Sequence, residues 1–148
     1  MDSEGAVSCR LNDLRNESAE AAPVFVHSTE NLGAIDYERL VHIGQIPTRD
    51  ISHDWYNGQV WLAFPKVKQL INTLHVQDAV RCAEQPGRLP ANGRSRLRDA
   101  LTLFDESGAL LLTTEWSLCT ALLQHDWKTL LLDQRESWST RARVLLLG

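Results

Sequence analysis

The sequence lacks the features that mark secreted and membrane-spanning proteins. Its three cysteines, Cys9, Cys82 and Cys119, are odd in number and widely spaced, without a CxxC pair or metal-ligand spacing. No apolar run approaches the roughly 18 residues that a membrane span requires. The first residues carry acids where a signal peptide needs basic residues. These absences exclude a disulfide scaffold and a transmembrane protein, and they predict a cytoplasmic location.

The motifs of common cofactor and catalytic sites are also absent. The chain contains no P-loop, no GxGxxG and no GxSxG, and no cysteine has the local signature of an activated thiol. Nucleotide binding by those routes and serine or cysteine nucleophiles are therefore unsupported. The sequence indicates no cofactor, so the cofactor is unknown.

Net charge limits the class of partner. With 15 basic and 19 acidic residues the formal charge is -4, which disfavours general adhesion to nucleic acid or to an anionic membrane. A loop with four arginines, Arg88, Arg94, Arg96 and Arg98, is the one basic stretch. A solvated loop is the simpler interpretation, and a nucleic-acid contact is the weaker alternative. A small-molecule ligand is left open.

The first half of the chain predicts a polar leader followed by helices. Residues 1–22 are polar, with apolar positions only at helical spacing, and predict a weak amphipathic helix or a mobile leader. Residues 24–26 predict a strand, and residues from Asp36 to Gly44 predict a short helix. A longer amphipathic helix begins near Ser52, and Pro65 should break it. At 100° per residue, His53 and Asn57 lead a stripe that we expect to face the core.

The second half predicts a small sheet. ALTLFDESGALLLT predicts a β-hairpin at about 100–113, with a turn from Asp105 to Gly108. RARVLLLG predicts a C-terminal strand at about 142–147. Helices packed on such a sheet make an α+β domain, which we expect to span 23–148 as a single domain.

The densest cluster of polar and aromatic residues is HDWYN, at the start of the longer helix. His53 is a candidate general base, Asp54 a carboxylate that adjusts the local charge, and Asn57 a group that orients a ligand. Alternatively, His53 and Asn57 satisfy each other's hydrogen bonds at a buried helix end. The favoured function is a small-ligand or partner-binding module with a polar-lined pocket here.

An enzymatic alternative needs more residues than HDWYN supplies. A metal-dependent or water-activating hydrolase would use His53 and Asp54 together with Asp99, if the fold brings Asp99 near. Trp55 and Arg98 are candidate ligand-binding residues, because indole and guanidinium groups suit recognition. The sequence does not name a metal, and it leaves open whether the protein is an enzyme.

Three segments, IPTRD, HDWYNGQVWLAFPKVKQLINTLH and RDALTLFDESGALLL, resemble in order and spacing the bacterial domain of unknown function 3025 family. The likeness runs from about Tyr37 to Gly148. It implies no particular activity, since the family has no assigned function. Because members of the family continue with a histidine and another helix, the resemblance also implies a truncated member, incomplete at its C-terminus.

Overall fold

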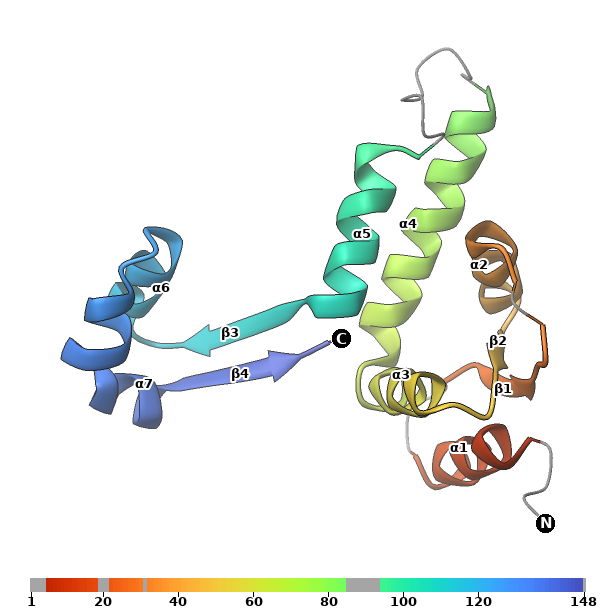
Figure 1. The fold of residues 1–148 in the computed structure, drawn as a ribbon, viewed down its shortest axis with the longest axis horizontal. Coiled ribbons are helices and arrows are strands. Elements are labelled where there is room, and N and C mark those ends of the chain that lie inside the picture. The colour runs from red at the N-terminus through yellow and green to blue at the C-terminus, as the bar shows by residue number, and fades with distance from the viewer. Residues whose placement is uncertain (1–4, 19–21, 31, 85–93, 148) are drawn as a thin grey trace. The chain divides into compact units, whose positions relative to one another are not determined.

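A computed structural model describes residues 5–18, 22–30, 32–84 and 94–147 (Figure 1). The chain divides into two compact units, one reaching Asp105 and the other beginning at Glu106. Helices dominate both units, and each contains one pair of strands. The expected α+β class is confirmed. Whether the two units act as the single expected domain stays a prediction.

The first unit contains a β–α–β element. Strand β1 (Val24–His27) leads through helix α2 (Ala34–His42) to strand β2 (Gln45–Thr48), and the two strands pair in parallel from Val24 opposite Gln45. A helical crossover is the usual way to join neighbouring parallel strands. Gly44 follows the C-cap Ile43 with a φ of 89°, a conformation that residues with side chains disfavour, and the helix expected from Asp36 to Gly44 is observed at Ala34–His42.

Helices α1 (Ala6–Glu17) and α3 (Ser52–Ala63) complete the core of this unit. Leu11 of α1 is buried with residues from the strands and from α2 and α3, namely Phe25, Val41, Ile46 and Trp61. The carboxamide of Asn12 donates a hydrogen bond to the carbonyl oxygen of Phe25 and accepts one from its amide. Of the two alternatives for residues 1–22, the helix is therefore the one observed at 6–17.

Two further helices follow α3. Phe64 leaves helical geometry, and α4 (Pro65–Glu84) begins with the proline, because proline fits a first helical turn but not an interior one. The break predicted at Pro65 is confirmed. Helix α5 (Arg96–Ser107) lies alongside α4 (Figure 1).

The second unit is built on two antiparallel strands. Strand β3 (Ala109–Thr113) pairs with β4 (Ala142–Leu146), and the connection contains α6 (Trp116–Leu123), the π-helix η2 (Thr129–Asp133) and α7 (Arg135–Arg141). Leu118, Ala121 and Leu130 form its buried core. The C-terminal strand expected at about 142–147 is confirmed.

The hairpin expected at 100–113 is wrong in its first half. Residues 96–107 form α5, and β3 takes its partner from the C-terminal end of the chain. Leu97, Leu101 and Phe104 recur at helical spacing, and Ser95 accepts a hydrogen bond from the Arg98 amide, as an N-cap does. These local signals outweigh the alternation of leucines that predicted a strand.

Among the helices that the structure describes, none has both the length and the apolar character that crossing a membrane requires.

Candidate functional site

Four polar side chains are buried along one face of α4. Lys68, Asn72, His75 and Asp78 are only 4%, 5%, 5% and 2% exposed, and their spacing places them in a line along the helix. We call these four residues the polar row. Burying a polar group costs free energy unless it gains partners, and burying a charge costs more. The burial of the polar row therefore needs an explanation other than packing alone.

Lys68 lies at the centre of a network that joins three helices. Its ammonium group is 2.5 Å from Asp105 Oδ1 on α5, and it donates a hydrogen bond of 2.9 Å to Asn57 Oδ1 on α3. The Asn57 amide donates in turn to the hydroxyl of Tyr37 on α2, at 3.3 Å. Burial raises the pKa of the Tyr37 phenol above its usual range, so this hydroxyl stays protonated. The Lys68 ammonium also lies 5.6 Å from the centre of the Trp61 ring.

Asn72 connects the polar row to α2. Its amide donates to both the backbone carbonyl and the Oε2 atom of Glu38, each at 2.7 Å. Burial raises the pKa of the Glu38 carboxyl, and it outweighs the opposing hydrogen bond from Asn72. The Glu38 carboxyl thus takes up a proton more readily than an ordinary glutamate.

Asp78 anchors the other end of the row to α5. Its carboxylate accepts hydrogen bonds from the Ser95 hydroxyl and from Arg81, with the Cys82 thiol 3.7 Å away. Burial alone would raise the pKa of Asp78, but the bonds from Ser95 and Arg81 hold it below its usual value. The positive end of the α5 dipole also favours a negative charge at this position.

His75 differs from the other members of the row in having a buried ring nitrogen, Nδ1, without a hydrogen bond to any residue that the structure describes. Burial lowers the pKa of the ring, and the positive charge of Arg98 lowers it further. The Nε atom of Arg98 is likewise buried without an acceptor. A neutral imidazole and a guanidinium with unused hydrogen-bonding capacity therefore lie close together between α4 and α5.

The polar row and its neighbours on α2 and α5 contain a cation held by carboxylate and amide oxygens, a protonatable acid, a neutral imidazole and a guanidinium. Such a set can recognise a polar ligand or transfer a proton, because perturbed pKa values concentrate at sites with those roles. The described residues do not bring together three histidine, cysteine or acidic side chains in the way that a metal site requires.

The structure places His53 differently from the sequence expectation. Its side chain is 73% exposed, so the predicted core-facing stripe that began at His53 is wrong there. Helix α3 buries Asp54, Gly58 and Trp61, so its buried face is shifted by one residue from the predicted stripe through His53 and Asn57. His53 Nδ1 lies 2.9 Å from Asp54 Oδ1 and forms no pair with Asn57.

Asp54 is bonded to Arg49, three residues before α3 begins. Its carboxylate accepts hydrogen bonds from the backbone amide, the Nε and an Nη atom of Arg49, at 2.8, 3.0 and 2.9 Å. Burial raises the pKa of Asp54, but these bonds and the His53 ring outweigh it and hold the pKa below the usual value. A carboxylate so occupied is a poor proton acceptor.

Asp99 and Arg98 lie on α5 and face different surroundings. Asp99 is exposed and lies 3.0 Å from Arg94. Among the described residues it forms no hydrogen bond or ion pair with His53 or Asp54, so the hydrolase stays a prediction without added support. Arg98 by contrast lies beside His75.

The other arginines of the predicted basic loop lie at or before the start of α5. Arg96 is the first residue of α5, Arg94 precedes it by two residues, and Arg88 lies outside the described residues. The nucleic-acid alternative also stays a prediction.

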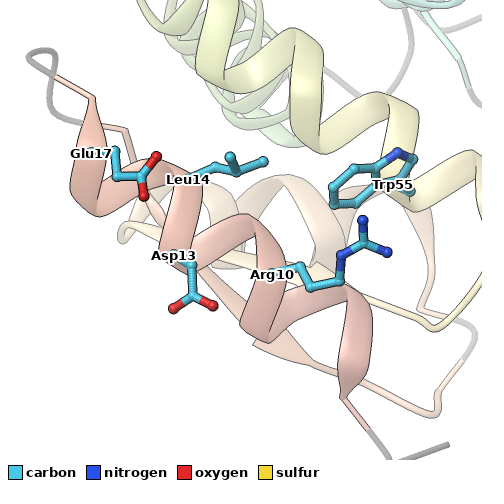
Figure 2. A pocket seen from close by; sticks show the side chains of 5 residues that line it. All are labelled: Arg10, Asp13, Leu14, Glu17 and Trp55. Atoms are coloured by element: carbon cyan, nitrogen blue, oxygen red, sulfur yellow. The ribbon is translucent and has the colours of Figure 1, made fainter.

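Trp55 borders a shallow hollow between α1 and α3 (Figure 2). The guanidinium of Arg10 lies 4.5 Å from the centre of the indole ring, and Asp13, Leu14 and Glu17 complete the lining. The acids and the arginine of this hollow come from α1. The hollow is open and mixed in charge, and it shares no residue with the polar row.

Sequence reasoning found Asn57 and Arg98 but missed the polar row itself. The signal was available in part, since Lys68, Asn72, His75 and Asp78 repeat at steps of four, three and three residues. A polar stripe at that spacing ordinarily marks a solvent face, so the sequence alone predicts exposure for these residues. Only the packing of α2 and α5 on α4 shows that the stripe is buried.

Comparison with known proteins gives one match. No curated protein and no solved structure is significantly similar to the chain. The family model described as protein of unknown function, DUF3025, matches residues 24–148, which include the whole polar row and every residue bonded to it. The family resemblance noted in the sequence is therefore confirmed, and the chain belongs to the DUF3025 family.

Proposed function

We propose that this protein is a binding module for a small molecule, and that the ligand contacts the polar row and its partners on α2, α3 and α5. The observation that carries the proposal is the near-complete burial of four polar side chains on one face of α4. Apolar residues at those positions would stabilise the fold at least as well, because a buried ion pair gives little net stability. Recognition of a ligand gives such residues a use that stability does not.

The proposal keeps the expected region but moves its centre. Asn57 belongs to HDWYN, and it is bonded to Lys68 and Tyr37. Asp54 is bonded instead to Arg49, which lies just before α3, and His53 is bonded to Asp54. A site at the polar row therefore uses the HDWYN segment through Asn57. A cytoplasmic location is part of the same proposal and rests on sequence composition.

The test begins with thermal unfolding of the full chain in the presence of a panel of neutral, anionic and cationic metabolite-sized compounds. A ligand that binds only the folded state raises Tm in proportion to its concentration and affinity. Hydrogen–deuterium exchange on the stabilised complex should then show added protection in α4 from Lys68 to Asp78 and in α5. If no compound raises Tm, the binding function is wrong.

A variant distinguishes the polar row from the hollow beside α1. Trp55→Leu removes the indole that borders the hollow, and it leaves all contacts of the polar row in place. We expect the ligand-induced rise in Tm to be the same in Trp55→Leu as in the parent protein. Loss of that rise, or added protection confined to α1 and α3, would assign the ligand to the hollow and contradict the proposed site.

A further inference from the structure

The two ends of the α4–α5 pair fix how the helices face each other. Lys68 is bonded to Asp105 at one end, and Asp78 to Ser95 at the other. Moving from Lys68 to Asp78 advances ten residues along α4, and moving from Asp105 to Ser95 goes back ten residues along α5. The helices are therefore antiparallel and in register over this length.

That register places His75 opposite Arg98. His75 follows Lys68 by seven residues, and Arg98 precedes Asp105 by seven. At about 1.5 Å of rise per residue, both lie about 10 Å along the axis from the Lys68–Asp105 pair. The influence of Arg98 on the pKa of the His75 ring agrees with this placement. The two buried nitrogens without partners, His75 Nδ1 and Arg98 Nε, thus occur at the same level between the helices.

The acids near Arg98 all have other partners. Asp105 is paired with Lys68, and Asp78 with Arg81 and Ser95. Glu38, whose carboxyl interacts electrostatically with Arg98, is bonded to Asn72. Arg98 makes no ion pair with any described residue. A guanidinium nitrogen that is buried without an acceptor is costly, and a carboxylate or phosphate oxygen is the acceptor that it binds best.

We infer that His75 and Arg98 together bind the carboxylate of a small organic acid between α4 and α5, with one oxygen on His75 Nδ1 and the other on Arg98 Nε. This inference rests on the proposed function and specifies the class of its ligand. A singly charged group fits better than a doubly charged phosphate, because Glu38 and Asp105 also act on this region and would repel a second negative charge. To donate to the anion, the imidazole must carry its hydrogen on Nδ1, as one neutral tautomer and the protonated ring both do.

The experiment uses the full chain with isotope-labelled histidine and follows the ring signals by NMR. Acetate is the probe, acetamide is its neutral counterpart of the same shape, and inorganic phosphate is the alternative anion, all at matched ionic strength. We expect acetate to shift the His75 signals in a saturable manner and to raise the pKa of the ring, since the bound anion favours the protonated form. Acetamide should do neither, and phosphate should bind more weakly than acetate.

Two arginine variants on the same helix supply a matched comparison. Arg98→Gln keeps a donor but removes the charge, and it should weaken acetate binding about tenfold or more. Arg96→Gln removes an exposed charge two residues away and should leave binding unchanged. If Arg98→Gln fails to fold, Arg98→Lys keeps the charge but loses the Nε donor, and the same loss is expected. Equal binding by the parent protein and the Arg98 variant would overturn the inference.

The outcomes separate this inference from the proposed function. If acetate leaves the His75 signals unchanged while a neutral or cationic compound protects α4 and α5, the carboxylate site is wrong and the binding function stands. A tighter response to phosphate than to acetate would overturn the choice of carboxylate. If no compound of any charge binds, both are wrong, and an ordered water between the two nitrogens becomes the explanation of their burial.

Discussion

Lys68 and Asp105, 37 residues apart in sequence, form an ion pair of 2.5 Å in which the ammonium side chain is almost fully buried. The pair joins α4 to α5 and lies about one helical turn from the contact between Asn72 and Glu38. It holds the Lys68 end of the polar row against α5.

Replacing Lys68 with methionine should lower the free energy of unfolding by about 3 kcal/mol, because it leaves the Asp105 carboxylate and the Asn57 carbonyl without their partner. Urea unfolding monitored by circular dichroism measures the loss. The double variant Lys68→Met with Asp105→Leu removes both charges and should recover much of the stability. A double variant no more stable than the single one would show that the pair does not act as a unit.

Acidification from pH 7.5 to below 6.5 should destabilise the protein through His75. Burial and the Arg98 and Arg94 guanidinium groups lower the pKa of the folded ring, while Asp105 and Asp78 oppose them. The unfolded chain therefore binds a proton at a higher pH than the folded chain, and folding stability is lost as pH falls from the unfolded value of 6.5 toward the lower folded pKa.

Replacement of His75 by leucine should flatten this part of the stability profile, as measured by urea unfolding at a series of pH values. Replacement of the exposed His42 by leucine should leave the profile as it is, which controls for the loss of one histidine. An unchanged slope in His75→Leu would mean that another group titrates in this range.

The Arg49–Asp54 contact predicts a separate loss of stability in stronger acid. The pKa of Asp54 is held below 3.8, so its contribution is fully present above that value and disappears as pH falls toward the folded pKa. At pH 7, Asp54→Asn should cost about 2 kcal/mol, the scale of hydrogen bonds to a charged group. Asp36→Asn, which alters an exposed pair with Arg39, should cost less than about 0.5 kcal/mol. Equal effects of the two substitutions would contradict the prediction.

Gly58 is a contact point between α3 and α1. A Cβ atom added at this position would lie within 2.7 Å of Leu11 Cδ2, and Leu11 is fully buried and has little room to move. Alanine normally favours a helix over glycine by about 1 kcal/mol, whereas overpacking costs about 1–3 kcal/mol. We therefore expect Gly58→Ala to destabilise the protein by about 1 kcal/mol in thermal unfolding.

A second variant replaces Leu11, the residue that a Cβ atom at Gly58 would contact. In a Leu11→Ala background the space beside Gly58 is open, so Gly58→Ala should become neutral or stabilising there. A loss of the same size in both backgrounds would place the cause outside the contact between these two residues.

The sequence predicted those features that depend on local chemistry. Pro65 divides two helices because it cannot donate a backbone hydrogen bond, and Gly44 ends α2 because its φ is positive. The α+β class, the strand at β1 and the strand at β4 followed from β-branched and leucine-rich runs. Helix α5 was mistaken for a strand because alternating leucines fit both periods over so short a segment.

The candidate site was harder to predict because it depends on contacts between distant segments. Asn57 and Arg98 were singled out by residue type, but Lys68 and His75 acquire their significance only when α2 and α5 cover α4. A polar stripe reads as a solvent face until the elements that bury it are known. His53 was misplaced for the complementary reason, since the HDWYN segment buries Asp54 and leaves the histidine outside.

The hydrogen bonds between Asn12 and Phe25 have a consequence for handling the protein. The carboxamide satisfies both backbone groups of Phe25, as a neighbouring strand would, so α1 shields the open edge of β1. The DUF3025 match begins only at residue 24, and a recombinant fragment cut to that boundary would expose this edge together with the apolar surface that Leu11 covers. Such a fragment should aggregate by edge-to-edge pairing, because it lacks the helix α1 that covers this edge in the longer chain.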